Sequence, residues 1–141
     1  IEINKLKSQG INKIILLSHS GYGYDRKIAR ETDGLDVILG GHSHNLIEGI
    51  KEGENLLYSK SGEPVVITQA GRDGKNFGVL NLEFDDKGII KKVQNNVATT
   101  RKPSIAGTTE GFCVMFRPDI CLKKSLVSRK LLVSSGLRRR F

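Results

Sequence analysis

Two short apolar runs separated by a helical stretch constrain the fold of this chain most strongly. The runs are "NKIILLSH" (12–19) and "LDVILGG" (35–41), and each contains unbroken Ile, Leu or Val. Such runs are typical of strands that are buried on both faces of a parallel sheet. Between them, "YDRKIARET" (24–32) predicts a helix with Asp25 as its cap and Gly34 after its end. Strand, helix and strand in this order predict a βαβ unit with two parallel strands.

The segments on either side of this unit complete an α/β pattern. At the N-terminus, Ile3 and Leu6 fit the apolar side of a helix that ends before Gly10. After the unit, four short strand-like segments are separated by turn residues, which predicts an antiparallel meander. These segments are residues 55–59, 64–70, 77–84 and 89–96.

The third of these segments alternates between apolar and polar residues. This alternation is expected to direct one set of side chains toward a core. That set is Phe77, Val79, Leu80 or Leu82, and Phe84. "DDKG" (85–88), which follows, is typical of a hairpin turn.

The excess of positive charge in this chain is confined to its last 41 residues. Residues 1–100 contain 13 Lys and Arg against 13 Asp and Glu, whereas residues 101–141 contain 10 against 2, so the net charge of +8 belongs to the latter. The basic character therefore says nothing about the partners of the first part. Because residues 98–141 also lack a helix or strand period, we expect a domain over residues 1–97 and a poorly ordered basic tail. An out-of-frame end would produce the same change in composition.

Cysteine usage and the N-terminus narrow the class of protein only slightly. Cys113 and Cys121 both lie in the tail, and two cysteines define neither a disulfide framework nor a zinc site. No apolar run is long enough to cross a bilayer, and "IEINKLKSQG" lacks the apolar stretch of a signal peptide. Since the chain starts without Met and as if within a helix, we expect it to be a piece of a longer chain.

The three histidines of the chain all follow the two predicted parallel strands. His19 comes after the first, and His42 and His44 come after the second. Because the C-terminal ends of parallel strands meet at one edge of a sheet, the three side chains are expected to converge. Neutral imidazole is the commonest metal ligand, and Gly40 and Gly41 allow the backbone to turn close to an ion. Surface histidines on ordinary loops are the alternative, but their joint location favours a metal site.

Two stretches of the chain resemble a known family. "LLSHSGYGYDRKIARETDGLDVILGGHSHN" and "PVVITQAGRDGKNFGVLNLEF" resemble the metallophosphoesterase (calcineurin-like) superfamily, and within it the 5′-nucleotidase/UDP-sugar hydrolase/apyrase branch. The resemblance covers about residues 3–97, which correspond to the C-terminal half of the family's catalytic domain. It implies a four-layer α/β/β/α sandwich and a hydrolase that releases phosphate from nucleotides or other phosphoesters by two-metal catalysis.

The same resemblance implies roles for the three histidines. His19 and His42 match ligands of the second of two divalent metal ions, such as zinc or manganese, and His44 matches a ligand of the first. The family's carboxylate ligands and its catalytic histidine belong to earlier motifs that are absent from this sequence, so no catalytic residue is assigned in this chain. We therefore expect the N-terminal half of the domain to be missing and the chain to be inactive alone. The family implies an extracellular, periplasmic or cell-surface location.

Two other kinds of function are considered. The chain could be a non-catalytic binding module whose basic tail contacts nucleic acid or acidic surfaces, or a structural metal-binding domain without turnover. Because a short terminal run such as "RRR" (138–140) is usually solvated, nucleic acid is not the expected partner. "GRDGKNFG" (71–78) could bring Arg72 and Lys75 to an anionic substrate, but a tight turn before a strand explains it better.

Overall fold

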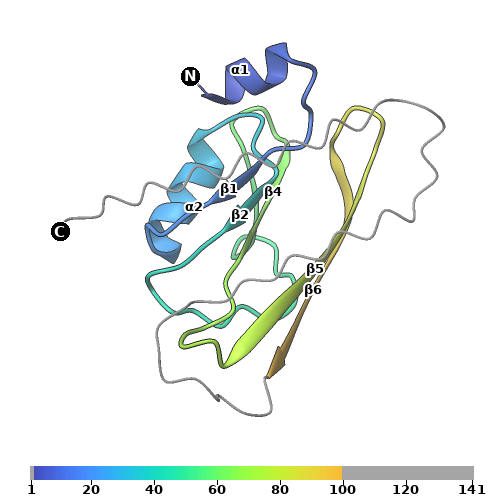
Figure 1. Ribbon diagram of the computed structural model, residues 1–141. Helices are drawn as coiled ribbons and strands as arrows, with labels where there is room; N and C mark the ends of the chain where they lie inside the picture. The colour runs from blue at the N-terminus through green and yellow to red at the C-terminus, as the bar shows by residue number, and fades with distance from the viewer. Residues whose placement is uncertain (1, 100–141) are drawn as a thin grey trace.

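The computed structural model describes residues 2–99, and predictions about residues 100–141 lie outside this range. The elements, in chain order, are α1 (Glu2–Ser8), β1 (Ile15–Leu17), α2 (Tyr22–Glu31), β2 (Val37–Leu39), β3 (Leu56–Tyr58), β4 (Pro64–Thr68), β5 (Asn76–Phe84) and β6 (Ile90–Thr99). The mixed α/β class is confirmed (Figure 1). β6 continues two residues into the segment that was predicted to be the tail. Neither helix in the described range is long and apolar enough to cross a bilayer.

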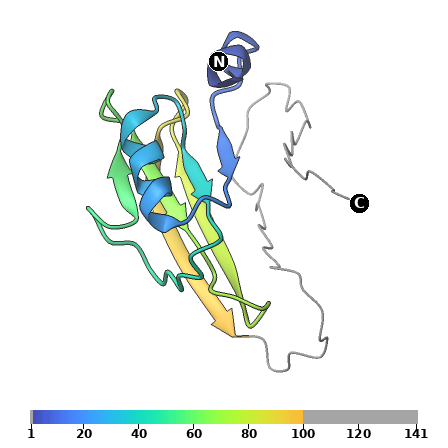
Figure 2. The same cartoon turned by 90° about the vertical axis from the view of Figure 1, so that its left-hand side faces the viewer.

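The described residues form three layers. α2 covers one face of a four-stranded sheet, and the β5–β6 hairpin covers the other (Figures 1 and 2). Alternate residues of β2 point to opposite faces: Ile38 lies in the core on the helix side, while Val37 and Leu39 lie in the core against the hairpin. This double burial explains the unbroken apolar run of the second predicted strand. The fourth layer of the implied sandwich stays a prediction.

The predicted βαβ unit is confirmed. β1 and β2 are parallel and neighbouring, with Leu17 paired to Leu39, and α2 connects them. β4 lies parallel on the other side of β2, with Leu39 paired to Thr68. The C-terminal ends of three strands therefore lie side by side at one edge of the sheet.

The predicted antiparallel strand pairs are confirmed, but their arrangement in one meander is wrong. β3 pairs antiparallel with β4, but β4 is inserted beside β2, and the sheet order is β1-β2-β4-β3. β5 and β6 form a separate antiparallel sheet of two strands. The physical reason lies in β4, where every residue from Val65 to Thr68 is buried. A strand that is buried on both faces needs a central position with a layer on each side, which an exposed meander does not provide.

Two smaller predictions, on the burial of β1 and on the direction of Phe77, are also wrong. β1 is an edge strand of three residues, and Leu17 is 50% exposed, so β1 is not buried as β2 is. In β5, Leu80, Leu82 and Phe84 face the core, whereas Phe77 is 36% exposed. Phe77 and Phe84 are an odd number of residues apart, so a regular strand cannot direct both toward one face.

Turn and cap predictions differ in their outcome. Gly10 has φ 79°, and the N–H groups of Gly10 and Ile11 donate to the carbonyls of Lys7 and Leu6, as expected for a glycine that ends a helix. The cap predicted for the second helix is wrong: the N-cap of α2 is Gly21, and Asp25 is the helix's fourth residue. The Asp25 side chain is instead buried between α2 and the sheet.

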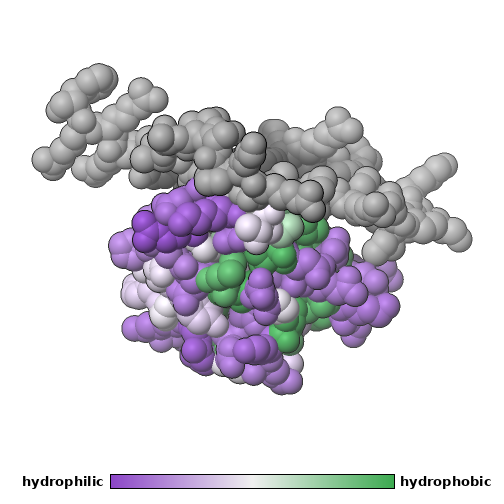
Figure 3. Space-filling view, turned by 90° about the horizontal axis from the view of Figure 1, so that it is seen from below, coloured by the Kyte–Doolittle hydropathy of each residue, from purple (hydrophilic) through white to green (hydrophobic). Residues whose placement is uncertain are grey.

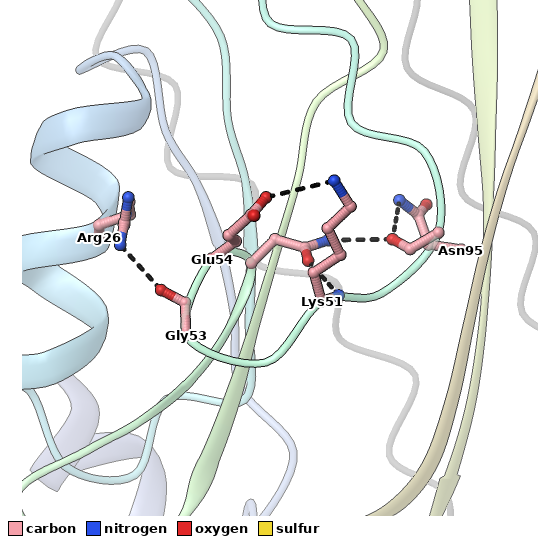
Figure 4. A network of polar contacts seen from close by, with 7 residues as sticks. Arg26, Lys51, Gly53, Glu54 and Asn95 are labelled. Atoms are coloured by element: carbon pink, nitrogen blue, oxygen red, sulfur yellow. Dashed lines mark hydrogen bonds and ion pairs between the residues drawn. The ribbon is translucent and has the colours of Figure 1, made fainter.

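Polar contacts fix the long connection between β2 and β3 to both neighbouring layers (Figure 4). Arg26 of α2 donates to the Gly53 carbonyl at 2.8 Å. On the other side, Asn95 of β6 donates to the Gly49 carbonyl at 3.3 Å. It also donates to the carbonyl of Ile47 at 2.8 Å. The connection is thus tied to α2 and to the hairpin, although it contains no regular element of its own.

Candidate functional site

The candidate site lies at the edge where β1, β2 and β4 end. The loops that follow these strands gather at the lower end of the sheet in Figure 1. A pocket of about 200 Å³ opens between them, and its lining includes Ser18, Gly40, Gly41, Gln69 and Arg72. Figure 3 views the molecule from this end and shows apolar residues among polar ones. The pocket therefore occupies the position where open α/β sheets usually bind ligands.

His19 and His42 meet at this edge. Their ring centroids are 5.4 Å apart with an angle of 71° between the ring planes, and both residues are exposed. The predicted convergence is confirmed for this pair. Two imidazoles that bind one ion through nitrogen atoms at about 2.0–2.1 Å hold their rings about 5 Å apart, so this spacing suits a shared metal ion.

His44 is placed differently. It lies close enough to Asp73, in the loop after β4, to act on that carboxyl group. The pKa of Asp73 is lowered first by a hydrogen bond from Arg72 Nε (2.7 Å), and then by the positive charges of Arg72 and Lys75, with a smaller effect from His44. The structure thus brings two of the three histidines together and places the third toward a different loop.

The loop "GGHSH" has an unusual backbone. His42 and His44 have φ values of 71° and 56°, in the left-handed region that glycine prefers. Ser43, between them, anchors the loop: its Oγ accepts from the Tyr22 N–H at 2.9 Å and donates to Gln69 Oε1 at 3.3 Å. Gln69 Oε1 also accepts from the Asn45 N–H. These bonds stabilise a backbone that would otherwise cost about 1–3 kcal/mol per residue.

Ser43 and Gln69 were missed by the sequence interpretation. Gln69 is 2% exposed and follows the buried β4, so its side chain lies under the histidine loop. Neither residue had a local signal in the sequence. Gln69 lay within a segment predicted as part of a meander, and only the insertion of β4 beside β2 brings it to this edge. The role of Ser43 depends on the position of Tyr22 in the folded chain.

Asp25 was the other residue whose position was missed. Its side chain is fully buried, and Oδ1 accepts from Ser18 Oγ at 2.5 Å. Burial raises the pKa of Asp25, and the Ser18 hydrogen bond opposes this effect. The available signal was its spacing: Asp25 is three and four residues before Ile28 and Ala29, and so shares their apolar helix face.

The described residues would supply only part of a metal coordination sphere. The imidazole nitrogens of His19 and His42 suit zinc and related ions. Within residues 2–99, however, no three His, Cys, Asp or Glu side chains cluster closely enough to hold an ion. A two-metal site would therefore need carboxylate ligands in addition to the described histidines.

Known proteins similar to this chain are 5′-nucleotidases. A snake venom 5′-nucleotidase from Crotalus adamanteus is 39% identical over 102 residues, which is 66% of this chain and 17% of that protein. The 5′-nucleotidase of Bos taurus is 36% identical over 104 residues, which is 67% of this chain and 18% of that protein. No protein-family model matches the chain.

The solved structures that superpose on this chain are also nucleotidases. The 5′-nucleotidase precursor from Thermus thermophilus superposes with a TM-score of 0.64 at 35% identity, over 70% of this chain and 21% of that one. The NAD nucleotidase of Haemophilus influenzae superposes with a TM-score of 0.53 at 33% identity, over 65% and 18%. The chain thus spans between 17% and 21% of the length of these four proteins.

Proposed function

We propose, on the premise that this chain belongs to the 5′-nucleotidases over the part it shares with them, that the protein containing it hydrolyses a phosphoester bond of a nucleotide. The observation that carries this proposal is the approach of His19 and His42 to 5.4 Å at the ends of two parallel strands. A pocket beside them leaves room for part of a ligand. The names of the relatives supply the substrate class.

The chain's contribution to such a reaction would be the placement of metal ligands. We infer that His19 and His42 bind one divalent ion, zinc or manganese, and that His44 binds a second. When bound, such a pair of ions polarises phosphoryl oxygens and makes a coordinated water a stronger nucleophile. Ser43 and Gln69 hold the loop that carries two of these ligands, so the imidazoles need little rearrangement on metal binding.

The remaining ligands are proposed to come from a part of the catalytic domain that this sequence does not contain. Two observations support this: the donor set within residues 2–99 lacks clustered carboxylates, and the chain corresponds to about a fifth of its relatives. β1 has one neighbour in the described sheet, and Leu17 on it is half exposed, so this edge offers a place for further strands. The chain alone is accordingly proposed to be inactive.

Fewer observations support the proposed location and the alternative functions. An extracellular, periplasmic or cell-surface location is proposed from the family and is supported by the venom enzymes among the relatives. The binding-module alternative depends on the basic tail, which lies outside the described residues. A structural metal site without turnover would leave the similarity to hydrolases unexplained.

Phosphate release from a nucleoside 5′-monophosphate, measured with added Zn²⁺ or Mn²⁺, tests the proposal. The 141-residue chain should release none, whereas the longer gene product that contains it should turn over. His42→Ala in the longer protein should abolish release, while Glu48→Ala, an exposed change in the same connection, should not. Turnover by the short chain would contradict its inactivity, and an inactive longer protein would contradict the nucleotidase function.

A further inference from the structure

We propose that Asp25 is a positioning residue that holds the end of β1 against the end of β2 and so sets the spacing of His19 and His42. The inference rests on the proposed function only in treating these histidines as metal ligands. The contacts that carry this effect run to residues beside the histidines in both loops, Ser18 and Gly40.

The first link runs through Ser18, the residue before His19. The Ser18 hydroxyl donates to Asp25 Oδ1 at 2.5 Å and accepts the Ser20 backbone N–H at 3.2 Å. The two residues that flank His19 are therefore joined to one another and to a carboxylate on α2. Because charge-assisted hydrogen bonds are about twice as strong as neutral ones, this contact restricts the turn that carries His19.

The second link is the packing of Asp25 against the start of the other loop. A Cβ atom added at Gly40 would lie 2.5 Å from Asp25 Oδ2 and 3.7 Å from Gln69 Nε2. The carboxylate is therefore pressed against the backbone two residues before His42. Both of these polar atoms are buried without a hydrogen-bond partner among the described residues. Asp25 thus lies between the two histidine loops and beside the amide that holds the second of them.

A purely structural role does not account for a carboxylate at this place. Asp25 is fully buried, and burying a carboxyl group with one of its two oxygens unbonded is costly. An apolar residue would fill the space between α2 and the sheet without that cost. What it could not supply is the bond to Ser18 that connects helix, turn and sheet edge.

The test uses the full 141-residue chain with Ser18→Ala, Asp25→Ala, the double variant and the rescue variant Ser18→Thr. Two quantities are measured: the Zn²⁺ dissociation constant, and the nuclear Overhauser contact between the His19 and His42 ring protons in the metal-free chain. The matched control is Ala29→Gly, which destabilises the same helix at a buried position outside the network. Urea unfolding of every variant reports the loss of stability.

Ser18→Ala and Asp25→Ala are each expected to weaken Zn²⁺ binding about tenfold. This is the lower limit of the effect usually seen when a residue that supports a metal ligand is replaced. The ring contact should also be lost. The double variant should be no worse than Asp25→Ala, because that change already removes the bond to Ser18. Ser18→Thr should restore both measurements, and Ala29→Gly should change stability alone.

Retention of the ring contact in both single variants would overturn the proposal. Loss of the ring contact in Ala29→Gly would also overturn it, because lower stability alone would then explain the effect. If Asp25→Ala does not fold, Ser18→Ala and its threonine rescue decide the matter. A wild-type chain that binds no Zn²⁺ but loses the ring contact in the variants would refute the metal site and leave the positioning role standing. Equal Zn²⁺ affinity in all variants, with the ring contact intact, would refute the positioning role of Asp25 and leave the metal site standing.

Discussion

His19 and His42 face each other edge to face across the ends of two parallel strands, with ring centroids 5.4 Å apart. This relationship gives the metal proposal a direct test within the chain. Both side chains are exposed and belong to neither hydrophobic core cluster, so replacing one removes a donor without removing core packing.

His42→Ala is predicted to weaken Zn²⁺ binding by at least about tenfold, because one of two neighbouring imidazole donors is lost. Competition with a chromophoric chelator measures the affinity. Glu48→Ala is the control, since Glu48 is an exposed residue of the same connection. Equal effects of the two changes would argue against His42 as a ligand.

Asp36→Asn is predicted to gain stability relative to the wild type as the pH rises from about 4 to 7. Burial raises the pKa of Asp36 from 3.8 to about 6, although its Oδ2 accepts the Ile14 N–H at 2.6 Å. A raised pKa means that the folded state binds the proton more tightly. Asp36 therefore contributes its full stability below about pH 4, and this contribution is lost as the pH rises through 6. The amide does not titrate and can still accept the Ile14 bond.

The relative gain in the free energy of unfolding is expected to be about 1–2 kcal/mol. This is less than the full pKa shift corresponds to, because solvent screens part of the carboxyl group. Urea unfolding at pH 4, 5, 6 and 7 measures it. Asp33→Asn should show no such gain between pH 4 and 7, because the pKa of Asp33 is lowered from 3.8, chiefly by the hydrogen bond from the Ser61 N–H, and its stability contribution changes only at lower pH. The same trend in both variants would contradict the assignment.

Gly88→Ala is predicted to destabilise the fold by about 2–4 kcal/mol, from the left-handed backbone and the clash together. Gly88 has φ 88°, and a Cβ atom there would lie 2.1 Å from the Asn12 carbonyl oxygen. Gly53→Ala is a matched control: its φ is 78°, but a Cβ atom would meet nothing within 4 Å. It should cost only about 1 kcal/mol. Equal losses of unfolding free energy would show that the hairpin tip does not pack on Asn12.

Asn95→Ala is predicted to lower the free energy of unfolding by about 2–3 kcal/mol, because the buried Thr68 hydroxyl and the Ile47 carbonyl lose a hydrogen-bond partner. Asn95 is 4% exposed, accepts from Thr68 Oγ1 at 3.1 Å, and donates to the Ile47 carbonyl at 2.8 Å. The exposed neighbour Asn96 is the control, and Asn96→Ala should stay within about 0.5 kcal/mol. Amide exchange should also quicken at Ile47 and Gly49 in the first variant only. Unchanged exchange there would mean that the connection is held by other contacts.

The local pattern of residues was sufficient for the elements that carry the candidate site. Unbroken apolar residues predicted β1 and β2, the periodicity between them predicted α2, and together they predicted that His19 and His42 would lie at one edge. Such patterns work because side-chain direction along a strand or helix is set by backbone geometry, which is a local property.

The position of β4 could not be obtained in this way. Its residues form an apolar run like that of β2, but whether such a run pairs with β3 alone or enters the first sheet depends on which layers cover it. The same limit explains Phe77, whose direction is decided by the single face of the hairpin that meets the sheet. Strand order is a property of the assembled layers, so it has no signature within one segment.

By itself, then, the sequence determined the βαβ unit, its glycine-rich turn, the position of the three histidines directly after its two strands, and the resemblance to the 5′-nucleotidase branch. Only the tertiary structure decided that His42 meets His19 while His44 lies near Asp73, and that Asp25 is buried between their loops. The reason is that burial and contact depend on residues far apart in the chain, whereas periodicity reports only the neighbours of each residue.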